Sequence, residues 1–75
     1  MSQTDERLLR CFQAVFPDLD ERQALRATMS NIGEWDSVAT TNLVAVVEEE
    51  FGVQFAPTEI EKLNSFQAFA ARLGA

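Results

Sequence analysis

The sequence predicts an all-α fold: a small four-helix bundle with a long loop between helices 1 and 2 and a short third helix. Apolar residues recur at helical spacing in three segments, and no strand-like alternation competes with them. Three residues that commonly end or follow a helix, Pro17, Gly52 and Gly74, come after those segments. With 75 residues, 47% of them hydrophobic, the chain is expected to form a single domain over residues 1–75.

The first helix is expected over residues 3–16, where apolar residues share one face and Pro17 ends the pattern. Ser2 and Asp5 resemble a capping box at its start. Residues 17–36 are expected to form the long loop, although DERQALRAT is compatible with one or two helical turns inside it. Irregularly spaced apolar residues are expected to anchor this loop to the core: Leu19, Leu25, Met29, Ile32 and Trp35.

The second helix is expected over residues 37–51, from Ser37 to the residue before Gly52. At about 100° per residue, one broad arc of this helix can face the core. That arc holds Ala39, Leu43, Val44, Val46, Val47 and Phe51. The solvent arc carries a narrow apolar stripe with polar and acidic neighbours, formed by Val38, Thr41 and Ala45 with Ser37, Asn42, Glu48 and Glu49. Because this stripe has no internal packing reason, we expect it to be a docking surface.

Two shorter helices are expected to complete the bundle. The third should cover residues 59–63, because Thr58 and Glu61 have the spacing of a capping box. The closing helix should begin near Phe66 and end at Gly74, since its apolar residues recur at intervals of three and four.

The charge balance narrows the classes of partner. Twelve acidic and six basic residues give a formal charge of −6, which disfavours binding to nucleic acid or to an anionic membrane surface. The same charge favours encounter with proteins that carry basic patches. We expect a monomer.

The N-terminal sequence and the single cysteine indicate the cellular compartment in which we expect the protein. The sequence from Met1 has no apolar secretory stretch, and Cys11 has no second cysteine to pair with, so we expect a cytoplasmic protein. Met1 and the close of the last helix near Ala75 suggest a free-standing protein, with an excised domain as the alternative.

Conventional catalysis has little support in the sequence. The chain has no histidine, which excludes a Ser-His or Cys-His nucleophile. Cys11 beside Phe12 is expected to serve in packing. Glu48, Glu49 and Glu50 point in different directions on a helix, so no metal site is expected. Because these carboxylates oppose the helix dipole, we expect a partner contact to explain them.

Ser37 has two possible roles at the start of the second helix. Its hydroxyl can act as an ordinary N-cap for an unpaired backbone N–H group. Alternatively, the positive end of the helix dipole suits a phosphorylated or phosphodiester-linked serine, because it stabilises an anion.

From residue 33 to residue 73 the chain resembles the acyl carrier protein family. Asp36, Ser37 and Val38 stand where that family has an Asp-Ser-Leu-like motif at the start of its second helix. The segments GEWDS, LVAVVEEEFG, PTEIEKL and SFQAFAARL follow the order and spacing of the family. Residues 3–16 fit its first helix more loosely.

The resemblance implies that Ser37, within the Asp36 motif, carries 4′-phosphopantetheine derived from coenzyme A. Acyl groups would be held as thioesters on this arm and presented to enzymes of fatty acid, polyketide or related lipid biosynthesis. The implied partners are a phosphopantetheinyl transferase and acyl-loading and acyl-processing enzymes with basic patches. The docking residues would be Val38, Thr41, Ala45, Glu48 and Glu49. The chain itself would not be an enzyme.

The sequence differs from the family pattern at several positions, and one other function is compatible with it. Ala39 and Asn42 replace acidic residues that are common in relatives, which affects the expected recognition of partners. Val38, Thr41 and Ala45 are smaller than the residues usual at these docking positions, which suggests a specialised pathway. Because six phenylalanines fill a small core, short acyl loads are expected to fit better than long ones. The main alternative is a non-covalent acidic helical adaptor that binds a basic protein through the second helix.

Overall fold

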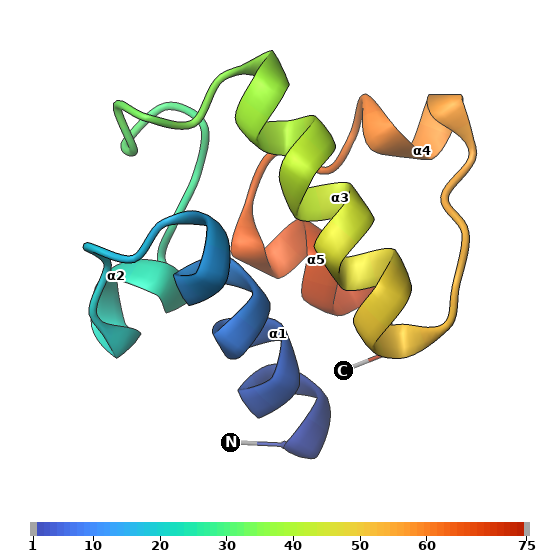
Figure 1. Ribbon diagram of the computed structural model, residues 1–75, viewed down its shortest axis with the longest axis horizontal. Helices are drawn as coiled ribbons and strands as arrows, with labels where there is room; N and C mark the ends of the chain where they lie inside the picture. The colour runs from blue at the N-terminus through green and yellow to red at the C-terminus, as the bar shows by residue number, and fades with distance from the viewer. Residues whose placement is uncertain (1, 75) are drawn as a thin grey trace.

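The structure, a computed structural model, describes residues 2–74 and is helical throughout its regular parts (Figure 1). Within those residues the helices are α1 (Gln3–Val15), α2 (Glu21–Leu25), α3 (Ser37–Phe51), α4 (Pro57–Ile60) and α5 (Phe66–Arg72). The prediction of a small all-α fold is confirmed. The expected bounds of the first two long helices agree with α1 and α3 to within one residue.

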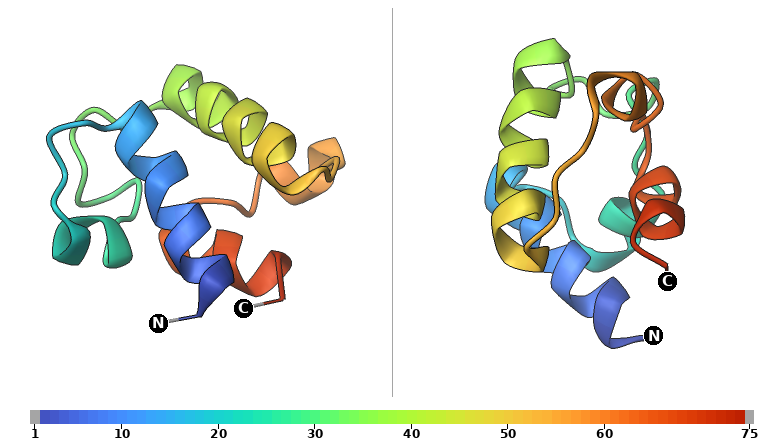
Figure 2. Two further views of the ribbon diagram at one scale, coloured as in Figure 1. Left: turned by 60° about the horizontal axis from the view of Figure 1, so that its bottom comes forward. Right: turned by 90° about the vertical axis from the view of Figure 1, so that its right-hand side faces the viewer.

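Helix α1 is the centre of the packing. It contacts α2, α3 and α5, and the right-hand view of Figure 2 shows α3 and α5 at separate edges of the molecule. Its buried residues are those of one face, Leu8, Leu9, Cys11 and Phe12. A single apolar stripe on α1 therefore forms the surface against which most of the fold assembles.

An aromatic cluster fills the middle of the core. The ring of Phe12, which is fully buried, lies 5.5 Å from Trp35, 5.1 Å from Phe66 and 5.6 Å from Phe69, measured between centroids. Phe16 packs against both Phe12 and Trp35. The cluster joins the loop before α3 to α1 and α5, so Trp35 is fixed by its contacts with rings from other segments.

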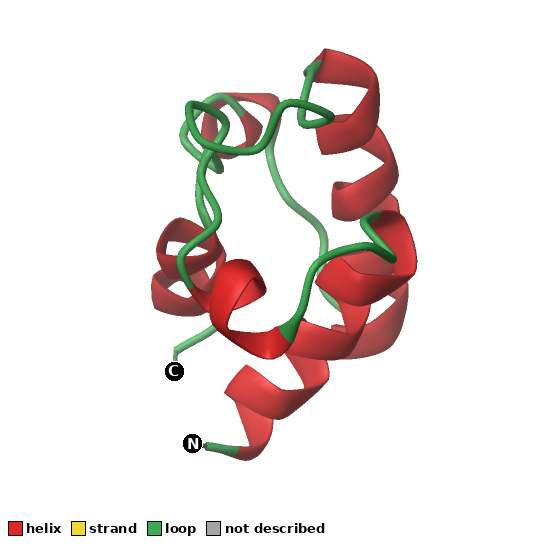
Figure 3. Cartoon of the chain, turned by 90° about the vertical axis from the view of Figure 1, so that its left-hand side faces the viewer, coloured by secondary structure: helices red, strands yellow, loops and turns green. Residues whose placement is uncertain are grey.

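The segment between α1 and α3 contains more structure than a loop with anchors (Figure 3). The helical turns considered for DERQALRAT form as α2, and a capping box that the sequence analysis missed defines its start. In that box the Asp20 carboxylate accepts from the Gln23 backbone N–H, and the Gln23 side chain accepts from the Asp20 N–H. Residues 2–74 thus form five helices in place of the four expected.

Backbone hydrogen bonds hold the second half of this segment beside the start of α5. The N–H of Met29 donates to Asn64 and that of Phe66 donates to Ala27, each over 3.0 Å. Of the expected anchors, Trp35 is buried and Leu19, Leu25 and Ile32 are partly buried against the core. Met29 is 39% exposed, so its assignment as a core anchor was wrong.

The third expected helix was misplaced. Helix α4 begins at Pro57, whose fixed φ suits the first helical position, and its N-cap Ala56 makes no side-chain cap. The capping box expected of Thr58 and Glu61 is therefore absent among the described residues. Lys62 and Leu63 donate to carbonyls three residues back, which continues α4 as a tight turn.

The last helix begins as expected and ends a little earlier. The Ser65 hydroxyl caps α5 by accepting from the Ala68 N–H, and Leu73 is the C-cap just before Gly74. In the described part of the chain, no helix has the length and apolar character needed to cross a bilayer.

Candidate functional site at Ser37

Ser37 is the first residue of α3, but it does not cap the helix. Asp36 is the N-cap: its backbone is extended, with φ −117° and ψ −170°, and its carboxylate accepts from the Ala39 N–H over 2.8 Å. Ser37 is exposed, and its hydroxyl has no hydrogen-bond partner within residues 2–74. The interpretation of Ser37 as a simple cap was therefore wrong, and its Oγ is left accessible.

The backbone around Ser37 is held in place by two threonines. Thr40 accepts a hydrogen bond from the indole Nε1 of Trp35 over 2.7 Å and donates to the Asp36 carbonyl over 3.0 Å. Thr41 donates to the Ser37 carbonyl, also over 3.0 Å. Because Trp35 belongs to the aromatic cluster, these bonds tie the first turn of α3 to the core.

Thr40 is a functional candidate that the sequence analysis missed. It is only 8% exposed and shares the buried face of α3 with Leu43, Val44 and Val47. Its spacing from these residues by three, four and seven positions is the signal that places it on the core arc. Because threonine is polar, the sequence analysis did not count Thr40 among the buried residues. Its burial is tolerated because its hydroxyl accepts a hydrogen bond from the Trp35 indole, a contact that forms only in the folded chain.

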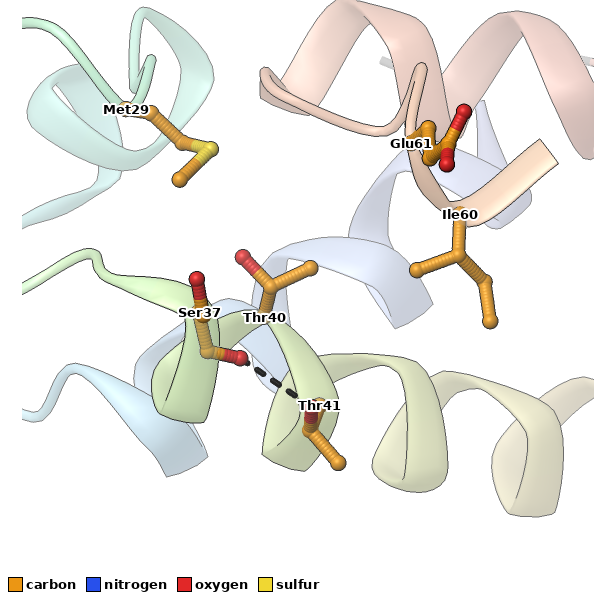
Figure 4. A pocket seen from close by; sticks show the side chains of 6 residues that line it. All are labelled: Met29, Ser37, Thr40, Thr41, Ile60 and Glu61. Atoms are coloured by element: carbon orange, nitrogen blue, oxygen red, sulfur yellow. Dashed lines mark hydrogen bonds between the residues drawn. The ribbon is translucent and has the colours of Figure 1, made fainter. Parts of the chain in front are cut away.

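A pocket of about 300 Å³ lies beside Ser37 (Figure 4). It is bounded by the first turn of α3, the end of α4 and the loop that carries Met29. Figure 4 shows Met29 and Ile60 facing this space from two sides, with Ser37 and Thr40 on the α3 side. Thr41 and Glu61 complete its lining. The exposed position of Met29, which the core prediction did not anticipate, makes it a wall of this pocket.

The solvent face of α3 matches the stripe expected from the sequence in its exposure. Val38 is 69% exposed, and Thr41, Ala45, Asn42 and Glu49 are exposed as well. Asp36 and Ser37, at the start of the helix, are exposed too. Their role in docking stays a prediction, and the geometry leaves these side chains accessible from outside.

Two of the three glutamates at the end of α3 have internal contacts. Glu48 is half-buried, contrary to its assignment to the solvent arc, and its carboxylate accepts from the Phe55 N–H over 2.8 Å. Glu50 pairs with Arg7 over 2.8 Å. The Glu48 hydrogen bond stabilises the chain reversal after α3, and the Glu50–Arg7 pair stabilises the packing of α3 on α1. Internal contacts therefore account for the positions of Glu48 and Glu50, and the expected contact with a partner stays a prediction.

The described residues contain no group of three or more histidine, cysteine, aspartate or glutamate side chains that could hold a metal ion. Cys11 is 4% exposed in the core, in keeping with its predicted packing role. The exposed polar groups at or beside the pocket include the Ser37 hydroxyl and the carboxylates of Asp36 and Glu61.

Comparison with known protein families gives a match over most of the chain. The model of a family described as "Phosphopantetheine attachment site" matches residues 6–73, which include every helix except the first residues of α1. Members of this family carry covalently attached 4′-phosphopantetheine and act as carriers of acyl groups without being catalysts. The comparison with curated proteins finds no match.

Proposed function

Since this chain belongs to the phosphopantetheine attachment site family, we propose that Ser37 is the residue that carries its 4′-phosphopantetheine. The chain is a phosphopantetheine carrier and not an enzyme. The observation that carries the proposal is the exposed Ser37 hydroxyl at the start of α3, which takes no part in the hydrogen bonds of the described chain.

The residues around Ser37 fit a phosphodiester at this position. Asp36 supplies the helix cap, so the Ser37 Oγ can be esterified without removing a bond that stabilises α3. The N–H groups of Ser37 and Val38 have no acceptor among the described residues, and they lie at the positive end of the helix dipole. The start of α3 thus offers an accessible nucleophilic oxygen and a favourable field for the resulting anion.

We propose that residues 1–75 form a single domain, which would carry acyl intermediates for fatty acid, polyketide or related lipid biosynthesis. The terminal thiol of the arm holds such an intermediate as a thioester. The contribution of the protein is to fix the point of attachment and to raise the local concentration of the intermediate at successive enzymes. This agrees with a sequence that contains no histidine.

Partner enzymes would recognise the α3 face that begins at Ser37. We infer that Val38, Thr41 and Ala45 supply contact, while Asp36, Glu48 and Glu49 attract basic patches. The family implies a phosphopantetheinyl transferase and processing enzymes as partners. The charge of −6 would speed the encounter of a monomeric carrier in the cytoplasm with such partners.

Modification of Ser37 can be tested with coenzyme A and a broad-specificity transferase. Intact-mass measurement should show one added 4′-phosphopantetheine on the wild-type chain and none on Ser37→Ala. Ser30→Ala is the matched control, because Ser30 is an exposed serine in the loop before α3, and it should be modified like the wild type. An unmodified wild type would favour the non-covalent adaptor, and a modified Ser37→Ala chain would place the attachment elsewhere.

A further inference from the structure

The pocket beside Ser37 is shallow. Of its lining residues, Thr40 alone is buried, while Ser37, Thr41, Met29 and Glu61 are exposed and Ile60 is half-buried. None of the phenylalanines of the core lines it. The pocket is therefore a hollow in the surface between α3 and α4, and Thr40 forms its floor (Figure 4).

A hydrogen bond between Thr40 and Trp35 closes the floor of the pocket, and aromatic rings pack against Trp35 on its core side. The Thr40 hydroxyl accepts from the Trp35 indole over 2.7 Å, and Trp35 is only 3% exposed. Behind the indole, the ring centroids of Phe12 and Phe16 lie 5.5 and 5.7 Å away. Any chain that passed Thr40 toward the core would have to separate a buried indole N–H from its acceptor and displace packed rings, and both changes are costly.

We propose that Trp35, held by Thr40, closes the core beneath the attachment serine, so that a group joined to Ser37 rests in the open pocket and does not enter the helical core. This rests on the proposed attachment at Ser37. Trp35 is then a residue that determines cargo: the carrier is suited to short acyl groups, and longer chains stay exposed to solvent and to partner enzymes.

The apolar walls of the pocket define what it can hold. Met29 and Ile60 present alkyl surface on two sides, and the Thr40 hydroxyl is already used in two hydrogen bonds. A short uncharged acyl chain can cover this surface without removing a polar group from water. Each further methylene would extend beyond the pocket and gain no contact with the protein, so native-state stabilisation should stop growing with chain length.

The test uses the whole chain with an arm on Ser37 that carries acetyl, butyryl, hexanoyl, octanoyl or dodecanoyl, each load verified by mass. In the wild type, the melting temperatures of the octanoyl and dodecanoyl forms should stay within about 2 °C of that of the hexanoyl form. Trp35 is the sole tryptophan, so its emission reports the floor directly and should not change with chain length. A stepwise rise of about 5 °C or more from hexanoyl to dodecanoyl, or a shift in emission with chain length, would overturn the proposal.

A matched pair of variants tests the role of Trp35 itself. Trp35→Leu opens space behind Thr40 and should make the melting temperature rise with acyl length. Phe55→Leu shortens another buried aromatic residue, which packs against Phe69 and does not line the pocket, and it should behave as the wild type. Equal behaviour of the two variants would refute a special role for Trp35. If Trp35→Leu does not fold, the wild-type series still decides whether chains enter. Failure to load any group at Ser37 would instead refute the proposed function and, with it, this inference.

Discussion

At the scale of single residues, Asp36 and Ser37 have separate tasks although they are adjacent. The Asp36 carboxylate accepts from the Ala39 N–H and satisfies the helix start. Ser37 follows it as the first helical residue, with an exposed hydroxyl. An Asp-Ser pair therefore allows the serine to be modified without loss of the helix cap, which a serine acting as its own cap would not permit.

This division predicts different effects on stability. Asp36→Ala should lower the free energy of unfolding by about 0.5–2 kcal/mol because the cap is lost, whereas Asp36→Asn keeps a cap acceptor and should lose less. Ser37→Ala should change it by less than about 0.5 kcal/mol, since an exposed side chain without a partner is replaced. Urea denaturation of the apo chain measures all three. If Ser37→Ala cost as much as Asp36→Ala, the serine would be the working cap.

At the scale of the element, α3 presents a buried face to α1 and an exposed face to solvent. The glutamates near its C-terminus differ in their contacts: Glu48 binds the Phe55 N–H, Glu50 pairs with Arg7, and Glu49 has no polar partner within residues 2–74. Glu49 is therefore the cleanest probe of docking, because reversing the charge of Glu48 would also disturb the chain reversal after α3.

We predict that Glu49→Lys slows modification of Ser37 by the transferase, mainly by slowing association. Raising the salt concentration from low to physiological should shrink the difference from the wild type. Glu21→Lys is the matched control, because it makes the same charge change on α2, which Figure 1 shows apart from α3. Initial rates measured at both salt concentrations test this, and equal slowing by the two variants would point to net charge and not to a docking face.

Val38 tests the contact part of the same face. Val38→Asp places a charge where we propose an apolar contact, and it should impair modification at every salt concentration. Since Val38 is 69% exposed, the unfolding free energy should change little, so a loss of rate would not reflect unfolding. If both Glu49→Lys and Val38→Asp kept the wild-type rate, partners would have to bind another surface.

At the scale of the whole molecule, packing around α1 buries the Cys11 thiol and changes its pKa. Cys11 lies on the buried face of α1 and is 4% exposed. Burial, with a smaller contribution from the nearby Glu50 carboxylate, raises the pKa of the Cys11 thiol from 9.0 to about 11. The thiol is therefore protonated in the native state at neutral pH and is shielded from reagents.

Cys11 should accordingly report global unfolding. At pH 8 a thiol-alkylating reagent should modify native protein slowly and unfolded protein fast, as intact-mass measurement over time would show. Because the folded state holds this proton more tightly, Cys11 should leave stability unchanged at neutral pH and should reduce it as the pH rises from about 9 toward 11. Cys11→Ser, which removes the thiol, should weaken that alkaline decline. Rapid labelling of native protein at pH 8 would contradict the buried position.

The sequence by itself determined the elements whose signals are local. The bounds of α1 and α3 follow from apolar spacing of three and four residues, from Pro17 after the first helix and from Gly52 after the second. Gly52 adopts the left-handed conformation, with φ 64°, that the end of α3 requires. The candidate serine and its motif were also recognisable, because the Asp36-Ser37 pair lies at a clear helix start.

Only the tertiary structure decided which polar groups are satisfied, and by what. The burial of Thr40 depends on the Trp35 indole, the half-burial of Glu48 on the Phe55 N–H, and the exposure of Met29 on the loop held beside Asn64. Each partner lies several residues away or in another segment, so no periodic pattern encodes the contact. The pocket at Ser37 likewise has walls from three separate segments, and its floor exists because packing in the core fixes the ring of Trp35 behind Thr40.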